Sequence, residues 1–286
     1  MTQIAYLGTG LLGSAFVEAA AKRGDQVTVW NRTASKARAL EQFGARVATS
    51  PADAVRGASS VHLVLTDDTV VDEVIAALRP GLSPDAIILD HSTNLPERTA
   101  ERSRKLNAAG VNYLHCPVFI GPPAARAGKG TVLASGPRKL FDARKDELSR
   151  MAERLEYFGE RPDLAAVWKL CGNAFFIGLT ALAADVFAIA RGADAPPADA
   201  LKVLELFNAS GIVAARGKTM LSGDVTTPNF ELTMARKDVR LMMETAGSMP
   251  LAALPGIAAR MDTLIAEGHG DEDSAVLGAE TAVAAR

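Results

Sequence analysis

Short apolar runs alternate with stretches of helical periodicity through about the first half of the chain. Each run has the length of a strand that is buried on both faces, and stretches such as 14–22 between them have the apolar spacing of helices. Strands that alternate with helices pair in parallel, so this pattern predicts a doubly wound α/β sheet with ligands at the carboxyl ends of its strands. The predicted strands are 3–7, 26–30, 59–66, 85–93, 110–118 and 128–136.

The pattern changes after Glu160, where strand-like runs stop. Residues 163–193 form one long predicted helix that is apolar on nearly all sides, and such a helix is expected to be buried over most of its surface. We therefore predict an α/β domain at 1–161 and an all-helical domain at 162–286, joined by this helix. The later helical stretches are 197–222, 228–246 and 250–267.

Composition and charge narrow the class of protein. The 286 residues are 48% hydrophobic and 22% charged, as in ordinary globular chains, and the net charge of −2 does not indicate a nucleic-acid-binding surface. Two cysteines, Cys116 and Cys171, are too few for a disulfide framework and fit a reducing compartment. We recognise no leader segment and no run of about twenty apolar residues that would span a membrane. The expectation is a soluble, cytoplasmic protein without nucleic-acid or membrane partners.

A glycine motif lies directly after the first predicted strand. Gly8, Gly10 and Gly13 have the spacing G-x-G-x-x-G, with a helix-like stretch and a second strand behind them. In this context glycines permit a tight turn and close approach of the backbone to a pyrophosphate, and the helix start offers free N–H groups to its oxygens. The turn therefore predicts a dinucleotide-binding site that includes the intervening residues Thr9, Leu11 and Leu12.

The end of the second predicted strand indicates which dinucleotide binds. An NAD-binding chain usually has an acidic residue here for the ribose 2′-OH, whereas this chain has Asn31, Arg32 and Thr33, with Lys36 one turn on. A guanidinium fork suits a 2′-phosphate, so these residues favour NADP(H) over NAD(H). The alternative is that Arg32 is a solvated surface arginine.

Polar residues follow two further strands at the same predicted edge of the sheet. Leu65 and Thr66 end one strand, and Ser92 and Thr93 end the next. They are candidates to line the groove, with Ser92 facing substrate and the other three facing the cofactor. Thr66 and Ser92 are equally well explained as ordinary caps of strand ends.

A lysine interrupts the long apolar helix. Lys169 lies among Trp168, Leu170 and other apolar residues, and Asn173 follows four residues later on the same face. A lysine that is partly removed from water can donate and accept protons, and an asparagine one turn away can orient it. The alternative is a lysine that extends its charged end to solvent along its apolar stem.

Six short segments, in order, make the chain similar to the β-hydroxyacid dehydrogenases, a family that includes 3-hydroxyisobutyrate and 6-phosphogluconate dehydrogenases. The segments are the glycine motif, LDHSTNLP, HCPVFIGPPAARAGKGTVLASG, KLCGN, RKDVRLM and GHGDEDSA. The resemblance implies a Rossmann domain, a helical domain on a long interdomain helix, and homodimers or homotetramers formed through the helical part.

The resemblance also implies roles for individual residues. KLCGN matches the family's K-x-x-x-N signature, which makes Lys169 the general acid/base and Asn173 its partner at the substrate. In RKDVRLM, Lys237 would lie near the nicotinamide, and Asp238 would support the surrounding helix. Imine reductases share this architecture, use NADPH and commonly carry other residues at the lysine position.

One segment departs from the family pattern. The family usually has Ser-Gly-Gly after Pro-Val, whereas Phe119, Ile120 and Gly121 follow Pro117-Val118 here. We expect these three to line the substrate site, where Phe119 and Ile120 could contact a larger or more apolar substrate. The alternative is that both pack on the helical domain. Arg126 and Lys129 are nearby cations for an acidic substrate group.

Together these features predict an NADP(H)-dependent oxidoreductase that interconverts a carbonyl compound (an aldehyde, semialdehyde or keto acid) and a hydroxy compound such as a β-hydroxyacid. No metal site is expected. Two alternatives are an imine reductase and a non-catalytic NADP-binding protein.

Overall fold

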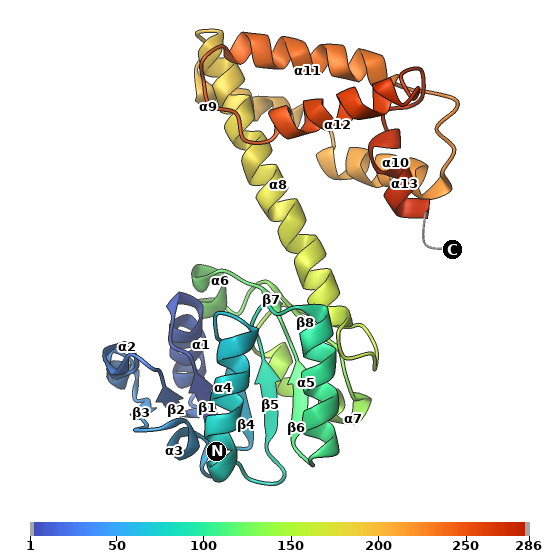
Figure 1. The fold of residues 1–286 in the computed structure, drawn as a ribbon. Helices are drawn as coiled ribbons and strands as arrows, with labels where there is room; N and C mark the ends of the chain where they lie inside the picture. The colour runs from blue at the N-terminus through green and yellow to red at the C-terminus, as the bar shows by residue number, and fades with distance from the viewer. Residues whose placement is uncertain (1–2, 284–286) are drawn as a thin grey trace. The chain divides into compact units, whose positions relative to one another are not determined.

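A computed structural model describes residues 3–283, and contacts between Cα atoms divide the chain into two compact units. The first unit ends at Asn173 and the second begins at Ala174, so the long helix α8 (Leu164–Gly192) contributes to both. The first unit is α/β and the second is helical in Figure 1. This confirms the predicted fold class.

A six-stranded sheet forms the centre of the first unit. All five pairs of neighbouring strands are parallel, and their order is β3-β2-β1-β4-β5-β6. The strand order reverses between β1 and β4, which is where doubly wound sheets bind ligands. The strands are β1 (Gln3–Leu7), β2 (Gln26–Trp30), β3 (Arg46–Val47), β4 (Ser60–Leu63), β5 (Ile87–Asp90) and β6 (Asn112–His115).

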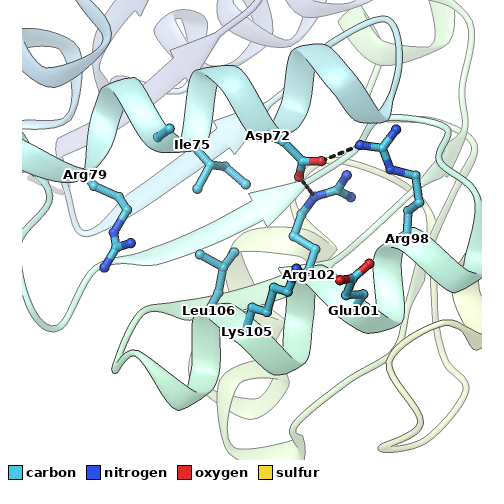
Figure 2. Close-up of a pocket in the computed structure, with 9 residues that line it drawn as sticks. Asp72, Ile75, Arg79, Arg98, Glu101, Arg102, Lys105 and Leu106 are labelled. Carbon is cyan, nitrogen blue, oxygen red and sulfur yellow. Dashed lines mark hydrogen bonds and ion pairs between the residues drawn. The ribbon is translucent and has the colours of Figure 1, made fainter.

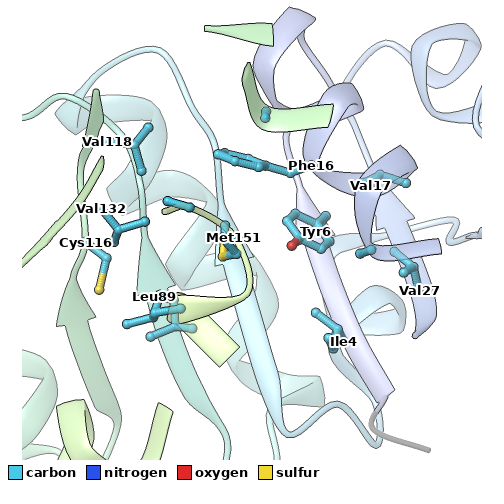
Figure 3. Close-up of a cluster of buried hydrophobic side chains, with 14 of the residues drawn as sticks. Ile4, Tyr6, Phe16, Val17, Val27, Leu89, Cys116, Val118, Val132 and Met151 are labelled. Carbon is cyan, nitrogen blue, oxygen red and sulfur yellow. The ribbon is translucent and has the colours of Figure 1, made fainter. Parts of the chain in front are cut away.

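Helices cover both faces of this sheet because its strands are apolar on both sides. Helices α1, α6 and α7 lie on one face, over a core that includes Tyr6, Phe16 and Leu89 (Figure 3). Helices α3, α4 and α5 lie on the other, against residues such as Leu7 and Ile88. The helices of the first unit are α1 (Leu11–Lys22), α2 (Ala34–Arg38), α3 (Pro51–Val55), α4 (Asp68–Leu78), α5 (Pro96–Ala108), α6 (Pro122–Arg126) and α7 (Arg138–Ser149), with 3-10 turns at Glu41–Phe43 and Arg79–Gly81.

A second, three-stranded sheet corrects the prediction of one continuous sheet. The predicted strand at 128–136 becomes β8 (Thr131–Ala134), which pairs with β7 (Val118–Phe119) and β9 (Arg154–Tyr157). An apolar run shows that a strand is buried, but it does not identify the strands that flank it. Strand β7 forms one edge of this three-stranded sheet. It runs antiparallel to β8, and Phe119 lies opposite Thr131.

The second unit is helical, as expected. Its core packs α11 and α12 around residues such as Leu232 and Met261. The predicted helix 197–222 is divided into three pieces, because the Asn208 side chain accepts a hydrogen bond from Gly211 N and starts a new helix. The elements after α8 are α9 (Pro197–Ala200), a 3-10 helix (Leu201–Glu205), α10 (Ala209–Ser222), α11 (Leu232–Ala246), α12 (Leu254–Ala266) and α13 (Val276–Val283).

Helix α8 is less buried than its sequence predicts. Only 11% of its most apolar 18-residue window is buried, so the expectation of burial on most sides is wrong for the single chain. By length and composition alone α8 could also cross a membrane, but the core helix of a soluble protein has the same properties, so the absence of a membrane partner stays a prediction. An apolar helix needs an apolar neighbour, but its sequence does not say whether its own chain supplies one.

Candidate functional site

The glycine motif forms a tight turn between β1 and α1, here called the glycine turn (residues 8–13). Gly8 has a φ of 97°, and a Cβ on it would stand 2.2 Å from the carbonyl oxygen of Val64. A Cβ on Gly13 would stand 2.0 Å from the carbonyl oxygen of Gly8, whereas one on Gly10 would meet no atom within 4 Å. Gly8 and Gly13 thus allow the turn to pack, and Gly10 leaves its outer side open to a ligand.

The start of α1 can receive an anion. Gly10 is the N-cap, no side chain of the described residues caps this helix start, and its first turn contains no acidic residue. The N–H groups and the positive end of the helix dipole therefore stay available to phosphate oxygens. Leu11 is 84% exposed beside this opening, and Leu12 packs partly against the core.

Asn31 fixes the glycine turn to the end of β2. Its Oδ1 accepts a hydrogen bond from Thr9 N at 3.0 Å, and its Nδ2 donates to the carbonyl oxygen of Thr33 at 3.0 Å. Thr9 is buried, and its carbonyl oxygen accepts a bond from Ser14 Oγ. The Asn31 side chain therefore holds the glycine turn against the segment after β2 that carries Arg32.

Two exposed cations lie beyond Asn31. Among the described residues, neither Arg32 nor Lys36 forms an ion pair, and Thr33 is exposed between them. An open cavity of about 510 Å³ extends from the glycine turn to these three residues and to Leu65 and Thr66. The cavity thus connects a helix start that is open to a phosphate with two cations that have no carboxylate partner among the described residues. This arrangement fits a dinucleotide with an additional phosphate.

The ends of β4 and β5 are held together by a buried serine. Ser92 is 2% exposed, and its Oγ accepts a hydrogen bond from Leu65 N at 3.0 Å. Thr93 is exposed and lines a cavity together with Asp67 and Leu170, which brings the first turns of α8 to this strand edge. Thr66 Oγ1 donates to Asp67 Oδ2, so Thr66 also supports the N-cap of α4.

Lys169 belongs to a compact group that we call the amine cluster: Lys169, Gly172, Asn173 and Phe119. Lys169 Nζ donates to Asn173 Oδ1 at 2.8 Å and lies 4.4 Å from the centroid of the Phe119 ring. A Cβ on Gly172 would stand 2.2 Å from Phe119 Cζ, so the ring packs directly on the helix. The ring stays partly exposed, and this contact lies within the first unit, so contact of Phe119 with substrate stays a prediction.

Partial burial changes the pKa of Lys169. Removal from water disfavours the ammonium form and lowers the pKa of Lys169 from its ordinary value of 10.5 to about 8. At neutral pH the amine is therefore charged, but its proton is far more easily lost than that of a surface lysine. A group with this pKa can act as both a proton donor and a proton acceptor.

Comparison with known proteins decides the family. Residues 3–159 match the NAD binding domain of 6-phosphogluconate dehydrogenase, and residues 164–279 match the NAD-binding domain of NADP-dependent 3-hydroxyisobutyrate dehydrogenase. The chain belongs to the β-hydroxyacid dehydrogenase family. It is accordingly an NADP-dependent oxidoreductase of the type that acts on CH–OH and C=O groups.

Individual relatives agree with this assignment. The chain is 30% identical to a 3-sulfolactaldehyde reductase of Escherichia coli, over 97% of this chain and 95% of the relative. Solved structures with the same fold include a reductive aminase from Aspergillus terreus (22% identity, TM-score 0.85) and an imine reductase from Myxococcus stipitatus (20%, 0.86). Each alignment covers 96% of this chain and 98% of the solved one, and at this identity the likeness concerns the fold alone.

The remaining predicted site residues make contacts other than those of the glycine turn and the amine cluster. Ile120 packs partly against the core, and Gly121 is the N-cap of α6. Arg126 pairs with Glu18 at 2.6 Å. Lys237 lies on α11 of the second unit, where its Nζ is 3.0 Å from Asp238, so its place near the nicotinamide stays a prediction.

Asp90, which was not among the predicted site residues, organises the loop after β5. Its carboxylate accepts hydrogen bonds from Ser92 N, Asn94 Nδ2 and Tyr113 OH at 2.7–2.9 Å. Burial alone would raise the pKa of Asp90, but the neighbouring His115 and these donors hold it at about 2. The available signal was a charged residue directly after the apolar run 87–89, since a buried charge must be paired.

A third cavity, between α4 and α5, does not belong to this site. Figure 2 shows Arg98 and Arg102 both directed to Asp72, and Lys105 pairs with Glu101. The two ion pairs of Asp72 join α4 to α5, and Arg98, Arg102 and Lys105 are each paired with a carboxylate, so we assign no ligand to this groove. Among residues 3–283, no group of three or more His, Cys, Asp or Glu side chains could hold a metal ion.

Proposed function

We propose that this protein reduces a carbonyl group with NADPH, or oxidises the corresponding alcohol with NADP+, and that Lys169 is its general acid/base. The observation that carries the proposal is the half-buried amine of Lys169, bonded to Asn173 in a chain of this family. The family relative from E. coli is named as an aldehyde reductase, which supports a carbonyl substrate.

The proposed chemistry divides the work between cofactor and protein. The bound nicotinamide supplies or accepts the hydride. In the reducing direction, the Lys169 ammonium gives a proton to the carbonyl oxygen. In the oxidising direction, the neutral amine takes the hydroxyl proton, and Asn173 Oδ1 keeps the amine oriented.

The cofactor is proposed to lie along the described cavity. The pyrophosphate would be received at the glycine turn and the start of α1, with Leu11 and Leu12 beside it, and the 2′-phosphate by Arg32, Thr33 and Lys36. Leu65, Thr66, Thr93 and Lys237 remain proposed cofactor contacts. Ser92, Phe119, Ile120 and Gly121 remain proposed substrate contacts, and the functional boundary remains proposed at 161/162.

The exposed apolar surface of α8 supports a proposal about the partner of this chain. Its Phe175, Ile177 and Leu179 are 59%, 70% and 56% exposed, which is unfavourable for a monomer in water. We propose that a second copy of the chain covers this surface in a cytoplasmic homodimer or homotetramer. Ile177→Lys should shift the protein toward monomer in light scattering, whereas Lys22→Glu, at an exposed site of the first unit, should not.

A substrate panel tests the proposed reaction. NADPH oxidation is followed with aldehydes, keto acids and cyclic imines, and NADP+ reduction with hydroxy acids. Turnover of carbonyl compounds is expected. Turnover of cyclic imines alone would make the protein an imine reductase, a candidate favoured by the aromatic Phe119 at the amine. NADPH binding without any turnover would indicate a binding protein.

A further inference from the structure

The Phe119 ring occupies space that only a glycine in α8 leaves open. The Cζ, Cε1 and Cε2 atoms of the ring would lie 2.2, 2.7 and 3.0 Å from a Cβ on Gly172. These distances are far shorter than a normal contact between carbon atoms, so any other residue at 172 would displace the ring. Phe119 and Gly172 therefore act as a matched pair that brings an aromatic face to this turn of α8.

Lys169 lies one turn before Asn173 and over the face of this ring. Its Nζ is 4.4 Å from the ring centroid and 2.8 Å from Asn173 Oδ1. An ammonium within about 6 Å of an aromatic centroid is attracted by the negative face of the ring, more strongly when water is excluded. The ring and the amide oxygen thus hold the ammonium through two different interactions.

We propose that Phe119 is the positioning residue for the Lys169 ammonium. An ammonium has three N–H donors. Asn173 Oδ1 receives one and the ring face attracts a second, which leaves the third in a fixed direction for a substrate oxygen. The inference rests on the proposed function, because it assigns Phe119 a part in orienting the acid/base.

According to this proposal, burial and the Phe119 ring shift the pKa of Lys169 in opposite directions. Burial lowers the pKa of Lys169, whereas the ring face favours the charged form and raises it. Weakening the negative ring face without changing the packing should therefore lower the pKa further. An aliphatic side chain of similar volume should have the same effect, together with less precise positioning.

Fluorinated phenylalanines at position 119 test this directly, because each added fluorine weakens the ring face while the ring stays in place. The Lys169 amine is titrated by NMR in protein with ¹³Cε-labelled lysine, its signal assigned by its loss in Lys169→Met. The titration midpoint should fall stepwise from mono- to trifluorophenylalanine, and kcat should fall with an unchanged KM for NADPH. The same series at the core residue Phe16 is the matched control and should leave the midpoint unchanged.

The outcomes separate this inference from the proposed function. A midpoint that is the same across the Phe119 series would overturn the positioning role and leave Lys169 as a candidate acid/base. A midpoint that falls while the pH profile of turnover does not move would support the contact between ring and amine, and would instead overturn the catalytic role of Lys169.

A double-mutant cycle gives a second test. Alanine normally favours a helix over glycine, but at 172 its Cβ would displace the Phe119 ring. Gly172→Ala should therefore lower kcat at least several-fold in the native background and have little further effect in Phe119→Leu protein. Equal effects in the two backgrounds would overturn the proposed pairing.

Discussion

The glycine turn and the amine cluster lie in the same unit of the chain, but they are held by different interactions. In the glycine turn, backbone approaches backbone so closely that Gly8 and Gly13 leave no room for a Cβ. In the amine cluster, side chains meet: Phe119 from β7 packs on Gly172, and Lys169 lies over its ring. The turn is built mainly from residues within about thirty positions of one another, with Val64 packing on Gly8 from further along the chain. The amine cluster, in contrast, depends entirely on two segments that only the fold brings together.

This difference predicts that the two regions can be damaged separately. Substitutions in the glycine turn and at the end of β2 should act on cofactor affinity, because these residues border the dinucleotide cavity. Substitutions in the amine cluster should act on turnover at saturating cofactor. Variants that affect both quantities equally would contradict the separation.

The largest effect is expected from Lys169→Met, which keeps the apolar stem and removes the amine. Loss of a general acid/base typically costs a factor of about 10²–10⁴ in rate, so turnover should collapse by that order. NADPH affinity should change little, and Asn173→Ala should lower turnover through the same step, because it removes the oxygen that orients the amine. Steady-state rates and NADPH affinity on folded protein are the measurements. Near-normal turnover would show that Lys169 is a helix lysine that extends to solvent.

The next largest effect is expected from Arg32→Ala, at the cationic end of the cavity beside the glycine turn. A charge-assisted hydrogen bond contributes about 1.5–3 kcal/mol, so NADPH affinity should fall roughly ten- to one-hundred-fold. NADH lacks the 2′-phosphate, and its affinity should hardly change. Arg38→Ala, at the exposed last residue of α2 and outside the cavity lining, is the matched control. Equal weakening of both cofactors would rule out the 2′-phosphate role.

The contrast between the two regions also explains what could be predicted from the sequence. The glycine turn was predictable, because its motif, flanking strands and helix all lie within thirty residues of one another. The contact between Phe119 and Gly172 was not, since nothing local to either residue indicates the other. The same reason applies to Ser92, whose hydroxyl bonds to Leu65 N of a neighbouring strand. Helix α8 shows a further limit, because its apolar sequence does not identify what covers it.

Gly13 and Gly10 of the glycine turn give a test with a smaller expected effect, which separates the packing of the turn from its contact with the pyrophosphate. Gly13→Ala would place a Cβ 2.0 Å from the carbonyl oxygen of Gly8, and such overpacking costs about 1–3 kcal/mol, so both Tm and NADPH affinity should fall. Gly10→Ala meets no protein atom within 4 Å, so Tm should be retained while NADPH affinity falls. Thermal unfolding and NADPH titration of both variants are the measurements. Unchanged NADPH binding by Gly10→Ala would remove the pyrophosphate from this position.

The smallest effect is the pH dependence that burial gives to Lys169. Its pKa of about 8 means that the ammonium needed for reduction is lost as the pH rises through 8, whereas the neutral amine needed for oxidation appears over the same range. kcat/KM for carbonyl reduction should therefore fall above about pH 8, and kcat/KM for alcohol oxidation should rise.

The same shift should appear in stability with a defined sign. Between about pH 8 and the ordinary lysine pKa of 10.5, the folded chain binds fewer protons at Lys169 than the unfolded chain does. The contribution of this residue to stability should consequently rise with pH over that window, and Lys169→Met should abolish the rise. Rate profiles in both directions and urea unfolding at pH 7.5 and 10 are the measurements. Opposed rate profiles that cross near pH 8 would tie the amine to the reaction, whereas parallel profiles would assign the titration to another group.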